Sequence, residues 1–442
     1  MHLLQRWSLF TKHKARRAEG ATTLQNKFIF FAFDLITRNM VRIGIIGKTN
    51  VGKTTFFNAA TLLNAKISTY PFTTKTPNWG IAYVQTPCVC REFKVKDNPK
   101  NSTCIEGWRF IPVEIIDLPG LIEGAHMGKG LGIQFLKVAM SSDVLLHVVD
   151  ASGSIDEEGK ICEPGKGNPI QDYYHVEKEL VMWFKTFIEL RKKRIERMME
   201  SKKWELSTTL RFIFSGAGIE LHTITEALEA SGLTDKKFPE WSNSDLENFS
   251  FSLKQKAKPT LIVANKMDLP PASDNYNKLV KELGERFVIP CSADAELALR
   301  RAEKAGMVKY IPGEEIFKIV NEQKLTDKQK WALSYVSDRV FGRWLRTGVQ
   351  FAINFAVFKL LRMNVVYPVL DDKKLTDSHG NVLPDAHLMP SDSTARDLAE
   401  KVHSDLAKHF IYAIDVRTGL RLPDNYLLRD RDVIKIVAAK KR

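Results

Sequence analysis

The stretch GKTNVGKTTF, residues 47–56, decides how the first part of the chain folds. Two glycines are separated by four residues, and the second is followed directly by Lys53 and Thr54. Glycines in this arrangement let backbone N–H groups point at phosphate oxygens at the start of a helix. The β-branched run 41–46 precedes the loop, and the helix-compatible run 55–60 follows it. The order of strand, loop and helix predicts a phosphate-binding loop in an α/β domain.

The residues of this loop have distinct expected roles. Lys53 reaches the β- and γ-phosphates and takes part in catalysis, and the Thr54 hydroxyl is a ligand of Mg²⁺. The residues expected to contact the nucleotide here are Gly47, Lys48, Thr49, Asn50, Val51, Gly52, Lys53, Thr54 and Thr55. A glycine-rich turn formed by chance is the alternative, so the other motifs of the chain have to decide between the two.

Composition narrows the class of protein and the kind of partner. The 442 residues, 44% of them apolar, are enough for two or three domains with sizeable cores. The net charge of +14 favours a polyanionic partner such as nucleic acid. Five cysteines without a CxxC pair favour a reducing compartment, and so a cytoplasmic location. The spacing of Cys88, Cys90 and Cys104 differs from that of zinc sites, so we expect buried thiols and no structural metal.

The first 39 residues carry seven Lys and Arg against two Asp and Glu. Their longest apolar run, residues 28–33, is followed at once by Asp34 and is too short to cross a membrane. Met40 directly precedes the first strand of the nucleotide domain. Residues 1–39 are therefore either a mis-assigned extension with the natural start at Met40 or a basic RNA-binding arm.

A second strand ends in the sequence DLPG, residues 117–120. Asp117 is expected to hold Mg²⁺, acting through water, and the Gly120 N–H is expected to face the γ-phosphate during catalysis. The following glycine-rich loop, residues 121–132, then becomes sensitive to the third phosphate. Thr74, in the threonine-rich segment before this strand, is expected to complete the magnesium shell.

The motif NKMD closes another apolar strand and predicts which base is bound. Asp268 can accept hydrogen bonds from N1–H and N2–H₂ of guanine, whereas adenine presents a lone pair at N1. Asn265 is expected to brace the loop and contact N7, and Lys266 to lie over the ring. The segment with Ser292 and Ala293 is expected to offer a backbone N–H to O6. Guanine is therefore favoured over adenine.

These motifs together resemble a known family. GKTNVGKTT, YPFTTKTPNWG, DLPGLIEGAHMGKGLGIQFL, NKMD and CSADAELALRRAEKAG are similar to those of Obg-family GTPases of the translation-factor class, in particular the YchF-like branch in its archaeal form. The resemblance covers the chain after Met40 and includes a C-terminal segment similar to a TGS domain. It implies a GTP/GDP switch that associates with ribosomes or other RNA. Some YchF members prefer ATP and have a degenerate base motif, whereas NKMD is intact here, so we expect GTP and keep ATP as the alternative.

The catalytic machinery departs from the Ras-like pattern at one position. Leu121 follows the DLPG motif where Ras-like enzymes have a glutamine that orients water, so intrinsic turnover should be slow. The resemblance implies a route without that glutamine. Asn50 matches the position that holds a potassium ion in related GTPases. His147 matches a histidine of the YchF pattern and either positions water or is a buried histidine on a strand.

The expected fold class is α/β, with a P-loop NTPase domain, a helical insertion and a C-terminal β-grasp domain. The nucleotide domain comprises residues 40–155 and 257–300, and the insertion 156–256 separates its halves. A helical segment, 301–362, links it to the TGS-like domain, 363–442. Residues 185–205 of the insertion are strongly basic, as either an RNA-facing surface or a solvated helix face.

The function expected from these features is a GTP-binding and GTP-hydrolysing switch that acts with ribosomes or RNA, with no DNA specificity and no membrane association. Two alternatives stay open. One is an ATP-preferring enzyme of the same branch, and the other is a nucleotide-stabilised RNA-binding or ribosome-binding module with negligible turnover.

Overall fold

The computed structural model describes residues 40–62, 77–120 and 138–439. These residues include both segments of the nucleotide domain, the insertion and the C-terminal domain. Thr74, Leu121, the glycine-rich loop that follows Leu121 and the extension 1–39 lie outside the described residues.

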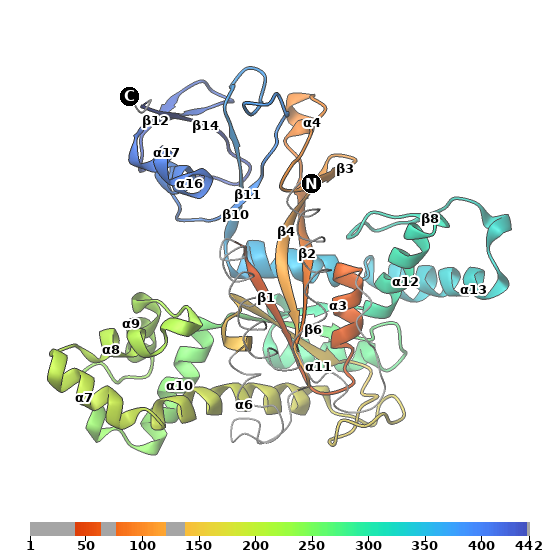
Figure 1. Ribbon diagram of the computed structural model, residues 1–442. Coiled ribbons are helices and arrows are strands. Elements are labelled where there is room, and N and C mark those ends of the chain that lie inside the picture. The colour runs from red at the N-terminus through yellow and green to blue at the C-terminus, as the bar shows by residue number, and fades with distance from the viewer. Residues whose placement is uncertain (1–39, 63–76, 121–137, 440–442) are drawn as a thin grey trace, which may run out of the picture. The chain divides into compact units, whose positions relative to one another are not determined.

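A seven-stranded sheet forms the centre of the nucleotide domain, in the order β2-β4-β1-β5-β6-β7 with β3 paired to β4 (Figure 1). Its strands are β1 (Arg42–Ile46), β2 (Asn78–Pro87), β3 (Thr103–Ile105), β4 (Trp108–Asp117), β5 (Val144–Asp150), β6 (Thr260–Asn265) and β7 (Val288–Pro290). Strands β4, β1, β5, β6 and β7 run parallel, whereas β2 and β3 run antiparallel to β4. Ligands of such sheets bind beyond the carboxyl ends of the parallel strands, where the sequence motifs also lie.

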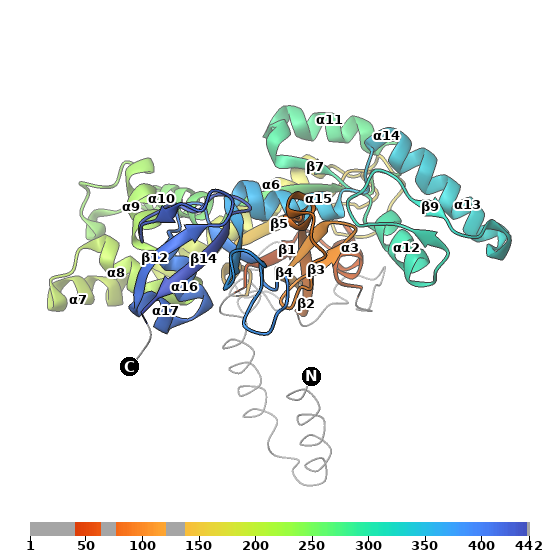
Figure 2. The same ribbon diagram turned by 90° about the horizontal axis from the view of Figure 1, so that it is seen from above.

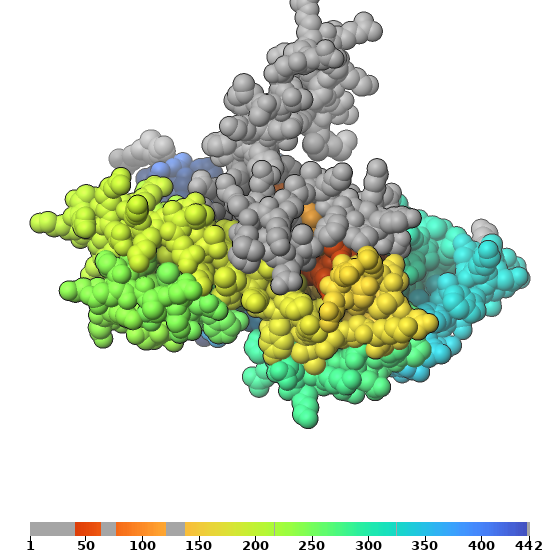
Figure 3. All heavy atoms as spheres, turned by 90° about the horizontal axis from the view of Figure 1, so that it is seen from below, coloured from red at the N-terminus to blue at the C-terminus, as the bar shows by residue number. Residues whose placement is uncertain are grey.

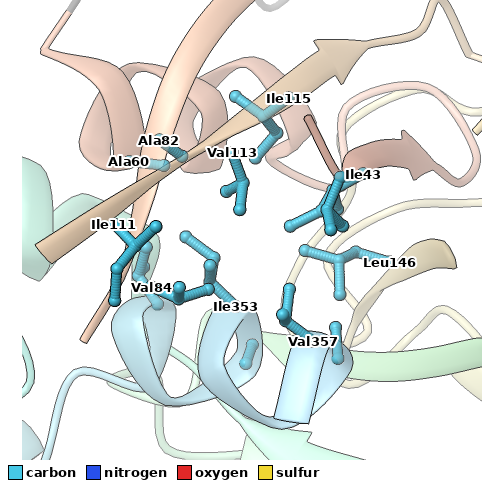
Figure 4. Packing of buried hydrophobic residues seen from close by; sticks show 14 of the residues in the cluster. Ile43, Ala60, Ala82, Val84, Ile111, Val113, Ile115, Leu146, Ile353 and Val357 are labelled. Atoms are coloured by element: carbon cyan, nitrogen blue, oxygen red, sulfur yellow. The ribbon is translucent and has the colours of Figure 1, made fainter. Parts of the chain in front are cut away.

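Side chains alternate between the two faces of this sheet and enter two different cores. On one face, Ile43 and Leu146 pack with Ile353 and Val357, as Figure 4 shows. On the other, Leu145 packs against the helical insertion. Helices α3 (Lys53–Thr61), α12 (Ala293–Lys304) and α15 (Val349–Phe355) contribute to the first core, and α11 (Ala272–Leu283) covers β6 and β7. A sheet buried on both faces explains why β5 is apolar along nearly its whole length.

Part of the predicted linker 301–362 differs from the expectation. Strands β8 (Val308–Lys309) and β9 (Lys318–Ile319) pair as a short antiparallel hairpin instead of a helix. Helices α13 (Asp327–Val336) and α14 (Gly342–Trp344) follow, and α15 belongs to the core of the nucleotide domain. The sequence shows helical periodicity in α15, but it cannot show that this helix covers the sheet.

The insertion between β5 and β6 is helical over residues 169–257. Its helices are α6 (Pro169–Glu189), α7 (Lys192–Lys202), α8 (Leu206–Ile213), α9 (Leu221–Ala230) and α10 (Asn243–Ala257). The side chain of Asn168 caps α6 by accepting from the Ile170 and Gln171 N–H groups, and Pro169 occupies the first turn. Figure 3 shows the exposed surface of these helices in yellow to green. Aromatic residues of the insertion, including Phe184 and Phe249, belong to the core that it shares with the sheet.

The C-terminal domain begins at Met363 with a five-stranded sheet in the order β11-β10-β14-β12-β13. Figure 2 shows this domain in blue. Its strands are β10 (Met363–Val369), β11 (His387–Pro390), β12 (Phe410–Asp415), β13 (Arg421–Leu422) and β14 (Val433–Ala438). Strands β10 and β14 run parallel, and the other pairs run antiparallel. Helix α16 (Ala395–Val402), capped by Thr394, packs its apolar face on this sheet, and α17 (Ser404–Lys408) follows. A mixed sheet with one packed helix is the predicted β-grasp arrangement.

Among the helices of residues 40–62, 77–120 and 138–439, none has the length and apolar character needed to cross a membrane.

Candidate nucleotide-binding site

The phosphate loop follows β1 and turns at glycines into α3. Gly47 has φ 143° and Gly52 has φ 99°, backbone conformations that L side chains rarely adopt. A Cβ on Gly52 would also lie 2.2 Å from the side-chain nitrogen of Asn265. The second glycine of the motif is therefore required both by its own backbone and by a side chain that crosses the loop.

Lys53 and Thr54 begin α3 directly behind this loop. The Lys53 ammonium donates to the Lys48 carbonyl at 2.5 Å, and burial lowers the pKa of Lys53 to about 8, although Asp117 acts in the opposite direction. The Thr54 hydroxyl donates to the Asp117 carboxylate at 2.8 Å. The two residues expected to hold the phosphates and the magnesium ion are thus close to one carboxylate.

Asp117 has the environment of a cation ligand. It is fully buried, and one carboxylate oxygen accepts from Thr54 and from Asn78, the latter at 3.0 Å. The other oxygen is buried without a hydrogen-bond partner among the described residues, and burial raises the pKa of this carboxyl. An unpaired buried carboxylate oxygen beside a hydroxyl is a donor set that suits Mg²⁺, so the residues present fit this ion.

Asn78 is a site residue that sequence reasoning missed. It is the first residue of β2, and the antiparallel register places it opposite Asp117 on β4. The threonines near Asn78 draw attention to this segment, but the pairing that brings the asparagine to the site is a property of the sheet. A polar residue at the start of a strand was the available signal.

Gly120 lies directly against the phosphate loop. A Cβ at this position would meet the Thr49 methyl group at 2.4 Å and the Thr49 backbone nitrogen at 2.9 Å. The chain that leaves β4 therefore crosses the loop at backbone distance. This position is consistent with the predicted contact between the Gly120 N–H and a terminal phosphate, which stays a prediction.

Asn265 connects three segments that are far apart in sequence. Its amide nitrogen donates to the Val51 carbonyl at 2.9 Å, and its oxygen accepts from the Ala293 N–H at 3.0 Å. The expected bracing role of Asn265 is thus visible in its hydrogen bonds. The contact with N7 of the base stays a prediction.

The predicted donors to guanine O6 already have other partners. The Ala293 N–H is used by Asn265, and the Ser292 N–H donates to the Thr347 carbonyl at 2.7 Å. The expectation that this segment offers a free N–H to O6 is therefore not supported by the geometry. Base selectivity depends correspondingly more on Asp268, whose pKa is raised by burial.

A loop after β5 fixes Lys266. Asp150 accepts from the hydroxyls of Ser152 and Ser154 at 2.6 and 2.8 Å and from the Lys266 ammonium at 2.9 Å. Lys266 has φ 63°, which turns the chain sharply after β6. Sequence reasoning missed this set, although the run DASGS directly after a buried strand was a visible signal.

The same loop continues across the phosphate loop. The Thr49 hydroxyl and the Asn50 amide donate to the Gly159 carbonyl at 3.2 and 2.9 Å. The Lys48 ammonium donates to Asp172 of α6 at 2.6 Å. Lys48 is therefore able to offer its backbone to phosphates while its side chain ties the loop to the insertion. The potassium ligand role of Asn50 stays a prediction.

Two aromatic side chains donate hydrogen bonds to the backbone of the guanine motif. The Tyr335 hydroxyl donates to the Asp268 carbonyl at 3.1 Å, and the Trp344 indole N–H donates to the Met267 carbonyl at 3.2 Å. They come from α13 and α14, far along the chain. No local signal in the sequence connects these residues to the NKMD motif.

His147 lies in a buried network on β5. It is 1% exposed, its ring stacks on Tyr173 at 5.2 Å, and it lies 3.8 Å from Glu177. Burial lowers the pKa of His147, while Glu177 of α6 pairs with Lys254 of α10. These surroundings are those of the buried-histidine alternative, and the water-positioning role of His147 stays a prediction.

The chain resembles known proteins along most of its length. Residues 263–371 match the family described as Obg-like GTPase YGR210-like, G4 motif-containing domain. A GTP-binding protein of Methanocaldococcus jannaschii is 44% identical over 402 residues, which are 91% of this chain and 100% of that protein. The chain belongs to the Obg-like GTPase family. A GTP-binding protein of Schizosaccharomyces pombe is 33% identical to this Obg-like GTPase over 82% of the chain and 90% of its own length.

Further matches cover both ends of this Obg-like GTPase. Residues 42–177 match a family described as 50S ribosome-binding GTPase, and residues 379–438 match the TGS domain. A crystal structure of a GTP-binding protein from Pyrococcus horikoshii superposes with a TM-score of 0.72 and 34% identity, covering 90% of this chain and 100% of that one. The YchF GTPase of S. pombe shares the fold, with a TM-score of 0.52 and 18% identity over 90% of this chain and 98% of that one. The predicted family, fold class and enzyme class are confirmed.

Proposed function

We propose that this Obg-like GTPase binds GTP in preference to ATP, hydrolyses it slowly with Mg²⁺, and uses its nucleotide state to control association with ribosomes or RNA. The observation that carries the proposal is the double hydrogen bond of Asn265. It joins the guanine motif to the phosphate loop, so a nucleotide whose phosphates occupy the loop has its base beside Asp268.

Asp268 supplies the discrimination between the two bases. A carboxylate accepts two hydrogen bonds from the N1–H and N2–H₂ edge of guanine, and adenine offers only a lone pair at N1. Burial raises the pKa of this carboxyl, and hydrogen bonding to its own backbone N–H acts in the opposite direction. Preference for GTP therefore depends on one side chain.

For turnover, the chain neutralises charge and orients phosphates. Lys53 and the backbone N–H groups of the phosphate loop face the negative charge, and Thr54 and Asp117 would hold Mg²⁺, with Thr74 as a further proposed ligand. The ion, when bound, would supply positive charge that offsets the negative charge of the phosphates. Gly120 is proposed to orient the γ-phosphate through its N–H, and Asn50 to hold K⁺.

The decisive test of base selectivity is Asp268→Asn with GTP, ATP and xanthosine triphosphate. An asparagine amide donates where the carboxylate accepted, which matches the C2 carbonyl of xanthine and not the amino group of guanine. GTP binding should weaken by about 3 kcal/mol, more than a hundredfold, and xanthosine triphosphate binding should strengthen. Gain of the new ligand shows that the variant is folded.

Asp274→Asn, at an exposed aspartate in the first turn of α11, is the matched control and should keep the preference for GTP. Equal or tighter binding of ATP by the wild-type chain would instead support the ATP-using alternative. Titration with each nucleotide in the presence of Mg²⁺ distinguishes these results.

Association with ribosomes or RNA is proposed from surface chemistry. The chain has a net charge of +14, and α7 exposes basic residues such as Lys193, Arg194 and Arg197 to solvent. Lys202 also lies over the Trp204 ring at 4.2 Å, so a cation and an aromatic ring are presented together. Co-sedimentation with ribosomes in the presence of a slowly hydrolysed GTP analogue should exceed that with GDP.

The alternative of a binding module with negligible turnover follows from Leu121, which replaces the water-orienting glutamine. Turnover measured with and without K⁺ and ribosomes separates it from the switch. Stimulation by either supports the switch. Turnover that stays undetectable under all four conditions, with GTP bound tightly, supports the binding module.

A further inference from the structure

Three thiols and a carboxylate converge at the end of the β2–β4 hairpin that lies away from the phosphate loop. Cys88 follows β2, Cys90 begins the short helix α4 (Cys90–Phe93), and Cys104 lies on β3. Asp97 comes from the loop between α4 and β3. One ligand atom from each of the four lies within 4.8 Å of all the others. The antiparallel pairing of β3 with β4 folds Cys104 back onto the other two cysteines.

The spacing of these atoms is that of a tetrahedral metal site. A Zn–S bond of about 2.3 Å in a tetrahedron places two sulfurs about 3.8 Å apart. The sulfurs of Cys90 and Cys104 are 3.8 Å apart. A carboxylate oxygen bound to the same ion lies about 3.5 Å from each sulfur, and Cys88 Sγ lies 3.2 Å from Asp97 Oδ2. These two separations are thus close to those that a bound zinc ion imposes, and all the ligand atoms lie within 4.8 Å of one another.

A buried arginine orients the carboxylate. Arg109 is fully buried on β4, and its guanidinium lies 3.1 Å from Asp97 Oδ2. The same guanidinium donates to the Ser102 hydroxyl and to the Leu383 carbonyl, both at 3.0 Å. Metal-binding carboxylates generally have such a second partner, which fixes their orientation. The arginine charge also offsets part of the negative charge that three thiolates and one carboxylate leave around a divalent ion.

We propose that Cys88, Cys90, Asp97 and Cys104 form a structural zinc site. Thiolate sulfur with one carboxylate oxygen in tetrahedral geometry is a donor set that favours Zn²⁺ over Mg²⁺ or Ca²⁺, which prefer oxygen ligands. All four coordination positions are filled by side chains, so the ion has no open position for a substrate. Binding of Zn²⁺ displaces the protons of the three thiols.

The site fixes the loop on which the C-terminal domain docks. Asp97 and Cys104 stand at the two ends of this loop, residues 97–104. Between them, the Asn98 N–H donates to the Val382 carbonyl at 2.8 Å, and the Lys100 N–H donates to the Pro384 carbonyl at 2.7 Å. A zinc ion that holds both ends thus orders the surface between the nucleotide domain and the TGS domain. This role goes beyond nucleotide binding and does not depend on the proposed preference for GTP.

The sequence alone predicts the opposite, namely buried thiols without a metal. That expectation is based on spacing along the chain, where the cysteines are separated by one residue and then by thirteen. Zinc sites usually contain a pair of ligands separated by two residues. Here a short helix and a strand that folds back bring the cysteines together instead. Because of the distances between the ligand atoms, we therefore propose a metal site in place of that expectation.

The test is the metal content of the full-length chain, purified under reducing conditions without chelators. We expect one zinc per chain. After replacement by Co²⁺, we expect visible absorption with sulfur-to-cobalt charge transfer. Cobalt bound by Thr54 and Asp117 at the nucleotide site has only oxygen ligands and gives no sulfur charge transfer, so the spectrum distinguishes the two sites.

Cys104→Ser and Asp97→Asn should lose the zinc or bind it much more weakly, and Cys162→Ser, outside the cluster, should keep it. If the ligand variants fail to fold, the wild-type chain still decides the matter through its thiols. With zinc bound, the three cluster thiols should react slowly with a thiol reagent, and zinc should be released as they react; Cys291 is also buried and should react slowly without releasing zinc. Zinc-free wild-type protein without cobalt charge transfer, a Cys90–Cys104 disulfide in reduced preparations, or full zinc content in Cys104→Ser would overturn the proposal.

Discussion

The β2–β4 hairpin has two ends that are built on different principles. At one end, Asn78 pairs with Asp117 beside the phosphate loop, and at the other, Pro87 pairs with Trp108 next to the cysteine cluster. The first end is organised by hydrogen bonds that Thr54 and Asn78 donate to the Asp117 carboxylate, and by the hydrogen bond from Asn265 to the loop backbone. The second brings together thiols and a carboxylate whose mutual contacts are weak, because thiols are poor hydrogen-bond donors. At the first end one Asp117 oxygen is buried without a hydrogen-bond partner among the described residues, and the second end would gain its strongest interactions from the proposed zinc ion.

The two ends differ in how readily the sequence alone reveals them. A phosphate loop depends on backbone N–H groups of consecutive residues, so its motif is contiguous and readable. A site made from side chains of a helix, a loop and a returning strand has no such constraint on its spacing. The comparison also separates the roles of the hairpin, since one end meets the nucleotide and the other meets the C-terminal domain. Three predictions test whether the two ends act independently.

Asp117→Asn should have the largest effect. The amide can still accept from Thr54 but carries no charge, so Mg²⁺-dependent turnover should fall at least a hundredfold, about 2.7 kcal/mol in activation free energy. Stability should not fall with it. Burial raises the pKa of Asp117, so the charged form of this carboxyl is disfavoured in the folded chain. The resulting loss of folding stability is therefore fully present at pH values above the raised pKa.

At neutral pH, the free energy of unfolding of Asp117→Asn should therefore equal or exceed that of the wild-type chain. Steady-state turnover and denaturant unfolding of the same preparation check both parts. A loss of turnover accompanied by an equal loss of stability would mean that Asp117 is a structural residue, and the distinction between the two ends would then disappear.

Asn101→Ala should act only at the cysteine end. Its side chain donates to the Ala386 carbonyl at 3.2 Å and accepts from the Ala386 N–H at 3.0 Å, so its loss should cost about 2 kcal/mol locally. Hydrogen exchange of residues 381–386 should accelerate, while GTP affinity stays constant. Asn98→Ala, which removes one exposed hydrogen bond to Asn381, is the matched control with a smaller effect. A change in nucleotide affinity would show that the ends are coupled through the hairpin.

The smallest effect is a pH dependence at the nucleotide end. The pKa of Lys53 is about 8, so the free chain loses this charge as the pH rises past that value. Phosphate binding needs the charged form, and GTP affinity should therefore be level below pH 8 and decrease by up to about tenfold per pH unit above it. Calorimetry in buffers of different ionisation enthalpy should detect proton uptake on binding above pH 8.

Lys258 provides a control for this prediction, because burial also lowers its pKa to about 8 while it donates to the carbonyls of Ser142 and Ala217. Lys258→Gln should keep the pH dependence of GTP binding. If that variant lost it, the titrating group would not be Lys53.

The sequence predicted those parts of the fold and site that are local. The phosphate loop, Asp117 and the NKMD motif each consist of neighbouring residues in a fixed order, and the helices and strands around them show their own periodicity. Partners that depend on pairing across the sheet were not predictable: Asn78 reaches Asp117 only through the β2–β4 register. Tyr335 and Trp344 reach the guanine motif only through tertiary packing.

The brace made by Asn265 also constrains when the protein can first hold its ligand during synthesis. The phosphate loop leaves the ribosome early, but the residue that crosses it is made only after the whole insertion, and Ala293 later still. Chains fold from the N-terminus domain by domain, so nucleotide cannot stabilise the young chain before β6 and the segment after β7 have emerged. The helices of the insertion are made in the interval. A chain interrupted within it would have a complete phosphate motif and no site.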